Sequence, residues 1–555
     1  RVAGRALGAA WAVTQRIDLP DPAGANKQIL EDLNNGANAL QLVFEGAIGD
    51  YGYALPATGA AIIAALDEIH LDAGIAVDLD LGRQSKDAAG LLATLVRARG
   101  VAPDSVKLRF GLNPLGTVVM NGEWPAPWPK IAADFAQLAA NLAGQGFAGP
   151  FAVADARPVH AAGGSEAQEL GFALACAVAY LRALEAAGIK LEDARRFIYF
   201  RFAADQDQFL TTAKLRALRK LWANIEKACG LEPRPAFVAA ETAWRMMTKR
   251  DPHGNIVRGT IAALAAAVGG AESITLLPFS AALGVPDGFA RRIARNTQTI
   301  LIEEANIHRV ADPAAGSGAI EALTNALCRT AWWFFQQVEK KGGAAEALRS
   351  GFIQRVVARV RAEREINSAR RKDNLVGTSG FPDLAEEKVS VLRQARLAPV
   401  SNNENALQPM RDAEPFERLR DRSDAFLGKL GARPKVFLAC IGRPSDFNTR
   451  ASFAKSLFES GGIEAVEGKG DNLTKQFAES GATLACLCSS DKVYAQEAAG
   501  VANALTQAGA KRVYLAGNPG ANRPALEQAG IGAFLHQGCN ALEILSAAYN
   551  EIDRK

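Results

Sequence analysis

The stretch FAVADARPVHAAGGSEAQELGFALACAVAYLRALE, residues 151–185, decides the fold that we expect. Residues 151–155 form a short apolar run typical of a strand, and residues 165–185 have the pattern and length of a helix. The apolar run at residues 171–184 is interrupted by Arg182 and is shorter than the ~20 residues of a membrane span, so we predict a buried helix. A strand followed by a longer helix is the repeating unit of parallel sheets, because parallel strands need crossover connections.

The same pattern repeats through residue 340. An amphipathic stretch follows each candidate strand, most clearly at residues 211–227. Eight such units predict a (β/α)8 barrel, although a doubly wound sheet would have a similar periodicity. The candidate strands are Ala39–Phe44, Ile75–Asp80, Val106–Phe110, Phe151–Asp155, Phe197–Phe202, Ala236–Ala240, Ile274–Pro278 and Ile307–Asp312.

A second α/β block follows a stretch in which the pattern fails. Residues 374–433 are rich in Asn, Pro and mixed charges, which indicates a mostly irregular connector along a domain surface. We therefore predict a barrel over residues 1–373, a linker over 374–433 and a second domain over 434–555. Five strand–helix units in that domain predict a flavodoxin-like, doubly wound fold. Its candidate strands are Val436–Cys440, Ile463–Val466, Thr483–Cys488, Arg512–Ala516 and Gly532–Leu535.

Composition narrows the function classes. The 555 residues are 49% hydrophobic and 22% charged, and the net charge is only +4, which is typical of a globular protein and gives no case for nucleic-acid binding. Seven cysteines without a CxxC pair indicate reduced thiols rather than a metal site or a disulfide framework. We see no signal peptide and expect a cytoplasmic protein with no membrane partner. The chain begins at Arg1 rather than Met, so we expect an upstream segment to be missing.

Two long motifs carry a resemblance to a known family. Residues 290–304, ARRIARNTQTILIEE, and residues 310–321, VADPAAGSGAIE, closely resemble the acyl-CoA mutase family. Residues 213–222, AKLRALRKLW, are similar to a family helix that leads to a tryptophan, and residues 11–15 and 29–33 look like small-subunit versions of family segments. The resemblance covers nearly the whole chain. It implies radical rearrangement of acyl-CoA esters, with methylmalonyl-CoA and succinyl-CoA interconverted. It also implies a barrel threaded by the CoA arm and a domain that binds adenosylcobalamin.

The second domain departs from the family pattern at its first strand. The family carries Asp-x-His-x-x-Gly there, and the resemblance implies that this His coordinates cobalt while the Asp orients it. Here Pro444 stands where the Asp would be, Asp446 where the His would be, and Thr449 or Arg450 where the Gly would be. A carboxylate is a poor replacement for imidazole on cobalt, and the bulkier residues would crowd the nucleotide tail of the cofactor. We expect no cobalamin and no metal on this chain.

The barrel departs from the pattern at two further places. The resemblance implies a Thr-His-Ser-Gln run on the predicted sixth strand, where the His would contact the thioester carbonyl, and this chain has the apolar run Phe237–Ala240 instead. It also implies His-Arg-Gly-Tyr in the first-strand loop, whereas residues 47–53 lack the His and Arg; Tyr51 or Tyr53 could align with the Tyr. We therefore predict no catalytic, cofactor-binding or metal-binding residues.

Other candidate residues have a structural and a functional interpretation. His160 follows the fourth predicted strand at the face where barrel enzymes place catalytic residues, and we favour a vestigial or interface role over catalysis. Five acidic residues near strand ends could form a site, but we favour helix capping. They are Asp80, Asp155, Asp205, Glu241 and Asp312. The aromatic run Trp332–Phe335 cannot lie on one helix face, so part of it should be buried and part should face the linker or a partner.

The leading hypothesis is a non-catalytic small subunit of a heterodimeric, adenosylcobalamin-dependent methylmalonyl-CoA mutase of propionate metabolism. It would stabilise a homologous catalytic large subunit that holds the cofactor. One alternative is an active mutase with an altered cobalamin-binding mode, which requires Tyr51 or Tyr53 to work with His160. Another is a regulatory or chaperone-like partner of the mutase. Whether the barrel admits CoA, and which acyl-CoA the complex prefers, stays open at this point.

Overall fold

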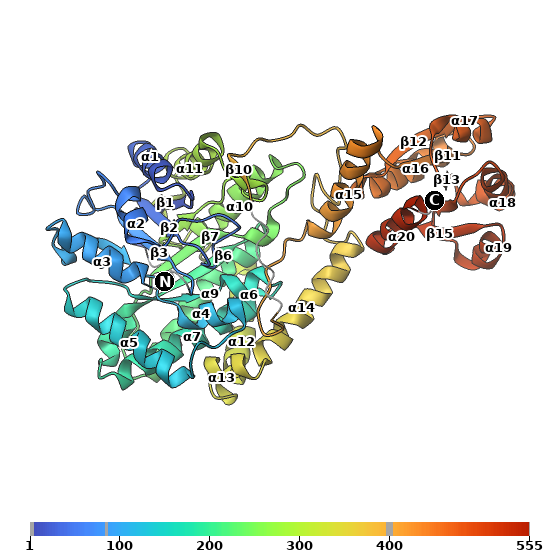
Figure 1. Ribbon diagram of the computed structural model, residues 1–555. Helices are drawn as coiled ribbons and strands as arrows, with labels where there is room; N and C mark the ends of the chain where they lie inside the picture. The colour runs from blue at the N-terminus through green and yellow to red at the C-terminus, as the bar shows by residue number, and fades with distance from the viewer. Residues whose placement is uncertain (1–4, 84–86, 396–402, 554–555) are drawn as a thin grey trace. The chain divides into compact units, whose positions relative to one another are not determined.

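The chain folds into two compact units in a computed structural model that describes residues 5–83, 87–395 and 403–553. The first unit contains the residues up to Met247 together with Asn255–Arg361 and Val389–Arg411. The second contains Thr248–Gly254, Ala362–Lys388 and the residues from Asp412 onward. Figure 1 shows helices packed around the strands of the first unit.

The first unit is a (β/α)8 barrel, as the repeating pattern predicts. Its strands are all parallel and follow the order β4-β3-β2-β1-β8-β7-β6-β5. A parallel bridge between Leu112 and Ala152 joins the two outermost strands and closes the sheet. The strands are β1 Ala12–Ile17, β2 Ala39–Val43, β3 Ala76–Asp80, β4 Lys107–Arg109, β5 Ala152–Asp155, β6 Ile198–Ala204, β7 Val238–Thr242 and β8 Ser273–Thr275.

Helices surround the barrel and bury its outward-facing residues. They are α1 Pro22–Asn34, α2 Gly59–Ala65, α3 Ala88–Ala98, α4 Pro114–Asn121, α5 Trp128–Gly144, α6 Arg157–Ala161, α7 Glu166–Ala186, α8 Leu191–Ala194, α9 Gln208–Ala228, α10 Gly254–Val268, α11 Gly288–Glu303, α12 Gly318–Lys340 and α13 Ala344–Arg349. The first half of α14 (Phe352–Ala369) also contributes Ile353 and Val357 to this core, and its residues from Ala362 belong to the second unit.

Helix α7 is the central helix of this shell. Its length and composition would allow it to cross a membrane, but 94% of its most apolar window is buried inside the protein, as predicted for a core helix. It packs on α12, where Gly171 lies so close to Phe334 that an added Cβ would be 2.7 Å from the ring. The aromatic run of α12 divides as expected: Phe334 and Phe335 are buried, whereas Trp333 is 59% exposed.

Two strand predictions in the barrel are wrong. The first strand, β1, was not predicted, because Thr14, Gln15 and Arg16 interrupt its apolar pattern. Residues 307–312 were predicted as a strand but begin with the short 3-10 turn Ile307–Arg309, none of which is buried. The number of strands is nevertheless eight, and the apolar run predicted on the sixth strand lies at and just before the seventh, β7.

The second unit is a flavodoxin-like parallel sheet in the order β12-β11-β13-β14-β15, and all five predicted strands are found. Separate apolar cores cover its two faces. Its elements are α15 Glu414–Leu430, β11 Lys435–Cys440, α16 Pro444–Ser460, β12 Glu464–Lys469, α17 Leu473–Ser480, β13 Leu484–Cys488, α18 Asp491–Gln507, β14 Arg512–Ala516, α19 Arg523–Gln528, β15 Ile531–Leu535 and α20 Ala541–Asp553.

The segment predicted as an irregular linker contains a long helix, α15. Pro415 occupies the first turn of α15, where its missing N–H has no helical partner to lose, and Gly431 ends the helix in the left-handed conformation. Earlier in the same segment, β10 (Arg393–Gln394) pairs antiparallel with β9 (Gly284–Val285). This pairing agrees with the prediction that the connector runs over a domain surface.

Candidate functional sites in the barrel and at the edge of the second sheet

The interior of the barrel is polar. In most barrels of this type, layers of Val, Ile and Leu fill the axis. Side chains alternate between the two faces of a strand. In this barrel the apolar residues, such as Val77 and Leu79, pack beneath the helices, so the residues next to them point toward the barrel axis. The inward positions are Thr14, Arg16, Gln41, Asp78, Asp80, Arg109, Val153, Asp155, Tyr199, Arg201, Ala239, Glu241, Ser273 and Thr275.

Arg157 is the centre of a buried ion network at the carboxyl ends of the strands. It begins α6, directly after β5, and its guanidinium contacts carboxylates from three alternate strands. Its Nη2 donates to Asp80 Oδ2 on β3 at 2.8 Å and to Asp155 Oδ2 on β5 at 2.7 Å. Its Nη1 donates to Glu241 Oε1 on β7 at 2.8 Å. One side chain therefore joins three strands across the barrel axis.

Two more arginines join the network. Arg16 Nη1 on β1 lies 3.5 Å from Glu241 Oε2, and Arg201 Nη1 on β6 lies 3.5 Å from Asp80 Oδ1. Gln41 donates to Glu241 Oε2 at 2.9 Å and accepts a hydrogen bond from Thr275 at 2.7 Å. Arg16 also pairs with Asp18 at 2.5 Å, and Asp18 pairs with Arg291 at 2.7 Å. The charges of the network therefore balance, with four guanidiniums against four carboxylates: Arg16, Arg157, Arg201 and Arg291 against Asp18, Asp80, Asp155 and Glu241.

The network keeps its members charged although they are almost completely buried. Burial acts to raise the pKa of Asp80, but the charges of Arg157 and Arg201 outweigh it and hold that pKa below its usual range. Burial also acts to raise the pKa of Glu241, and Arg157 and Arg16 lower it on balance. Burial alone would lower the pKa of Arg157, whereas Asp155, Asp80 and Glu241 raise it. Asp80 and Glu241 are ionised together with the arginines because each supplies the counter-charge of the other.

The loop after β2 covers this network. The Gly49 carbonyl accepts a hydrogen bond from Arg16, and a Cβ at position 49 would lie 2.5 Å from Asp80 Oδ2. The Tyr51 hydroxyl donates to Glu241 Oε1 at 2.9 Å, and its ring stacks on Trp244 with 4.1 Å between centroids and 5° between planes. Protein groups therefore occupy the position at which barrel enzymes bind and transform their substrates.

His160 and Tyr51, which the active-mutase alternative requires to work together, have different partners in the structure. His160 is buried, and its Nε2 lies 2.9 Å from Asp205 Oδ2. Burial and the charge of Arg245 lower the pKa of His160 to about 3, so the imidazole is neutral. The charged neighbours of Tyr51 are Glu241, Arg157 and Arg16, and they are different from those of His160.

Tyr53, the other candidate in the loop, donates its hydroxyl to the Ala281 carbonyl at 3.1 Å. Of the apolar run at residues 237–240, Phe237 lies beneath the Arg109 guanidinium at 4.3 Å from its ring centroid, and Ala239 faces the barrel interior. No polar group from this run therefore reaches the axis.

The capping interpretation of the acidic residues holds only for Asp155, whose Oδ1 accepts a hydrogen bond from the Arg157 N–H at the start of α6 at 3.0 Å. Asp80, Asp155 and Glu241 form the ion network, and none of the other four predicted residues is the N-cap of a described helix. Asp205 pairs with Arg245 at 2.8 Å, and Asp312 pairs with Arg216. The arginines Arg16, Arg157 and Arg201 were missed. Their positions on or just after strands, facing acids at equivalent positions, were the signal that could have indicated an ion network.

At the edge of the second sheet, the Asp446 side chain accepts a hydrogen bond from a backbone N–H group. It lies in the first turn of α16, and its Oδ2 accepts a hydrogen bond from the Arg443 N–H at 3.1 Å. Its Oδ1 lies 3.4 Å from the Ser490 hydroxyl. At the position where the resemblance implies a cobalt ligand, this chain therefore has a carboxylate that stabilises a helix terminus.

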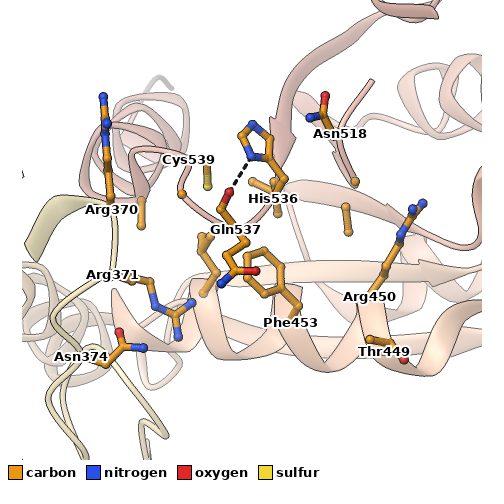
Figure 2. Close-up of a pocket in the computed structure, with 16 residues that line it drawn as sticks. Arg370, Arg371, Asn374, Thr449, Arg450, Phe453, Asn518, His536, Gln537 and Cys539 are labelled. Carbon is orange, nitrogen blue, oxygen red and sulfur yellow. Dashed lines mark hydrogen bonds between the residues drawn. The ribbon is translucent and has the colours of Figure 1, made fainter. Parts of the chain in front are cut away.

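The Arg450 side chain, from α16 (Figure 2), lies against the residues that follow β13 and β14. Its guanidinium donates to the Ser489 carbonyl and to Asp491, each at 2.7 Å, and lies 5.1 Å from the ring centroid of Tyr494. A Cβ at Gly517 would be 2.9 Å from Arg450 Nη1. Doubly wound domains bind ligands at the carboxyl ends of such strands. The first two turns of α16 offer no imidazole here, and Arg450 fills space beside β13 and β14, so these residues do not fit a cobalamin coordinated by a histidine of that segment.

The barrel and the doubly wound domain together define a two-domain α/β protein with the architecture of the acyl-CoA mutases. The family model described as methylmalonyl-CoA mutase matches residues 6–426. The chain belongs to the methylmalonyl-CoA mutase family.

Relatives agree with this assignment. The chain is 44% identical over 551 residues to a protein of Streptomyces virginiae named methylmalonyl-CoA mutase small subunit, covering 98% of this chain and 85% of the relative. It is 38% identical to the protein of the same name from Propionibacterium freudenreichii subsp. shermanii, covering 92% and 77%. A methylmalonyl-CoA mutase of Escherichia coli is 35% identical over 234 residues, covering 42% and 33%.

We predict that Glu241→Gln destabilises the barrel strongly. The change leaves the buried Arg157 and Arg16 short of one negative charge, and breaking a buried ion pair costs about 3–5 kcal/mol. Urea unfolding checks this loss in the free energy of unfolding. Lys130→Gln is the control, because Lys130 and Asp134 form an exposed pair whose loss should cost about 0.5 kcal/mol or less. Equal effects of the two substitutions would contradict a stabilising network.

We predict that His160 makes the folded barrel less stable as the pH falls. The folded chain holds this imidazole neutral down to about pH 3, whereas the unfolded chain binds the proton below about pH 6.5. The free energy of unfolding of the wild type should therefore fall relative to His160→Gln between pH 6.5 and 4, by up to about 1.4 kcal/mol per pH unit. Denaturant titrations at several pH values measure the difference.

The comparison with His160→Gln is needed because a neighbouring group acts in the opposite direction. Burial raises the pKa of Glu169 to about 7, so the folded chain gains stability as that carboxylate takes up a proton. This contribution is present in both proteins and cancels to first order. A difference between them that does not change with pH would show that His160 is not held neutral.

We predict that Asp446→Ala lowers the stability of the second unit by about 1 kcal/mol, as expected for loss of a helix-capping carboxylate. Ser445→Ala, at an exposed neighbouring position in the same turn, should change it little. Thermal unfolding followed by circular dichroism compares the two. A loss of the same size from both variants would argue against the capping role.

Proposed function

We propose that this chain is the non-catalytic small subunit of a heterodimeric, adenosylcobalamin-dependent methylmalonyl-CoA mutase. Its partner is a homologous large subunit that holds the cofactor, and the complex interconverts methylmalonyl-CoA and succinyl-CoA. The names of the full-length relatives, which include the words small subunit, support this assignment. We further propose a cytoplasmic location and a role in propionate metabolism, as the family resemblance implies.

The buried ion network around Arg157 carries the proposal. In a barrel enzyme, the polar groups at the carboxyl ends of the strands bind the substrate. In this chain Asp80, Asp155 and Glu241 are bound to arginines instead, and Tyr51 is bound to Glu241. A CoA arm threaded along the axis would have to separate these pairs, and an uncompensated buried charge costs several kcal/mol. We therefore propose that the barrel does not admit acyl-CoA.

A barrel with this interior suits a stabilising subunit. The centre of the barrel needs no substrate to balance its charges, because each charge of the network has its counter-charge within the chain. Such a unit offers the large subunit the same surface whether or not substrate is bound. A partner that binds only the folded large subunit stabilises it by mass action, and the effect grows with the concentration of the small subunit.

Co-expression with the large subunit tests the proposal. We expect a tag on this chain to purify a one-to-one complex that contains one cobalamin by absorbance and converts methylmalonyl-CoA. The isolated chain should be colourless and should give no binding heat with methylmalonyl-CoA in calorimetry. Cobalamin retained by the isolated chain would contradict the proposal.

Tyr51→Phe in this chain separates the proposal from the active-mutase alternative. The substitution removes a hydroxyl that an active site here would use, while Glu241 keeps its bonds to Arg157 and Gln41. We expect the turnover of the assembled complex to stay within about twofold, a change below 0.5 kcal/mol in the activation free energy. Large loss of turnover in a complex that still assembles with full cobalamin would favour catalysis by this chain.

A further inference from the structure

Residues 403–411 form a strap along two short helices, α4 and α6, in the connections that follow β4 and β5. The strap belongs to the first unit, and its residues Leu407 and Met410 are buried. The Leu407 N–H donates to the Val119 carbonyl in the last turn of α4, and the Met410 N–H donates to the Ala161 carbonyl at the end of α6, each at 2.8 Å. The strap therefore satisfies carbonyl groups that the ends of these helices leave without a helical partner.

Two further contacts fix the strap nearer its beginning. Gln354 on α14 donates its Nε2 to the Asn405 carbonyl at 2.9 Å. Gly122 ends α4 with a φ of 69°, and an added Cβ there would lie 2.6 Å from the backbone nitrogen of Ala406. A larger residue at position 122 would displace the strap, so the end of α4 is shaped to receive it.

The last residue of the strap, Arg411, contacts the loop after β7. Its Nη1 donates to the Met247 carbonyl at 3.1 Å, and its guanidinium lies 5.7 Å from the ring centroid of Trp244. Arg411 is only 4% exposed, so little water surrounds the cation beside the indole ring. Removal of water strengthens the attraction between a cation and the face of an aromatic ring. Arg411 therefore holds Trp244 in place.

Trp244 connects the strap to the loop after β2, residues 44–55, which forms a lid over the ion network. The Trp244 ring stacks on Tyr51. The Arg16 guanidinium lies 4.8 Å from the centroid of the Tyr51 ring, and the Tyr51 hydroxyl donates to Glu241. These residues belong to the first unit, and with Arg411 they form a continuous series of side-chain contacts from the strap to the ion network.

The tip of the lid has hydrogen bonds within the loop itself. The Ala47 N–H donates to the Phe44 carbonyl and the Asp50 N–H to the Ala47 carbonyl, each at 3.0 Å. The Asp50 carboxylate accepts hydrogen bonds from the Gly46 and Gly52 N–H groups. Such bonds shape the tip but do not attach it to the strands, so its position over the network depends on side chains that contact it from outside.

We propose that the strap is the latch that keeps the lid of the barrel closed. Arg411 holds Trp244, Trp244 holds Tyr51, and Tyr51 holds the lid over the ion network. Release of the strap therefore frees the lid, and the two segments open together although they are far apart in the sequence. The latch is a property of the barrel and does not depend on the role proposed for the whole chain.

Hydrogen exchange of the full chain, followed by mass spectrometry, tests the latch because amide exchange reports local opening. Arg411→Gln removes the cation beside Trp244. We expect exchange to become about tenfold faster in residues 403–411 and also in residues 44–55, since the contact of a buried cation with the indole ring is lost. Residues 318–340 of α12 should exchange at the wild-type rate, which shows that the barrel stays folded.

Arg182→Gln is the matched control for the loss of an arginine. Arg182 lies near the end of α7, is 60% exposed and pairs with Glu339 on α12. We expect this variant to leave the exchange of the strap and of the lid unchanged. A rise in the lid equal to that in Arg411→Gln would overturn the proposal.

A change near the other end of the strap distinguishes a latch from a local contact, and it carries the test if Arg411→Gln destabilises the whole barrel. Gln354→Ala removes the hydrogen bond to the Asn405 carbonyl and leaves Arg411 and Trp244 in place. We expect exchange to become about threefold faster in the strap, as for loss of one hydrogen bond, and by a similar factor in the lid. The proposal is overturned if either variant frees the strap while the lid keeps its wild-type exchange, or if neither variant frees the strap.

Discussion

The contact of Arg157 with three carboxylates is the interaction on which the barrel depends. Removing charges from water is expensive, and the attraction between them compensates only where geometry is good and every hydrogen bond is made. Arg157 meets this condition because β3, β5 and β7 place Asp80, Asp155 and Glu241 around one planar guanidinium. The strands supply the positions, and the ion pairs in turn fix the spacing of the strands. The loop over Gly49 follows, since only a residue without a Cβ can approach so closely.

In the second unit, side chains likewise bind polar groups at the carboxyl ends of the strands. The carboxyl ends of parallel strands carry backbone groups that a ligand would usually satisfy. Here Arg450 binds the Ser489 carbonyl, and Asp446 binds the Arg443 amide. In both units, side chains at the carboxyl ends of the strands make contacts within the chain. The family scaffold persists because its outward-facing apolar residues, not its site residues, hold the helices to the sheets.

Most of the fold was predictable because apolar residues repeat at the periods of strands and helices. The pattern failed where burial is polar: β1 carries Thr14, Gln15 and Arg16, which look like surface residues but face the barrel interior or α1 and α11. It also failed at α15, because the prolines of residues 374–433 were counted as a sign of an irregular connector, whereas Pro415 lies in the first helical turn, where proline is favoured.

The ion network was not predicted because its members are far apart in the sequence. Asp80, Arg157 and Glu241 are separated by more than seventy residues, and each acid taken singly resembles a helix cap. Only the closure of the barrel brings them together. The departures at Asp446 and Phe237 were visible in the sequence, because each compares one residue with a family position. Whether this chain binds cobalamin or acyl-CoA stays a prediction.

The balanced interior also constrains how this sequence can change over generations. Asp80, Arg157 and Glu241 each pair with more than one charged group. A single substitution at any of these positions therefore gives a protein with an unpaired buried charge. Such an intermediate loses much of the 5–15 kcal/mol, roughly, by which domains are stable. Substitutions here are tolerated only in matched sets, and the effect of one depends on the others. Single substitutions that remove one member of the network are therefore costly, and the network is expected to change only by coupled substitutions.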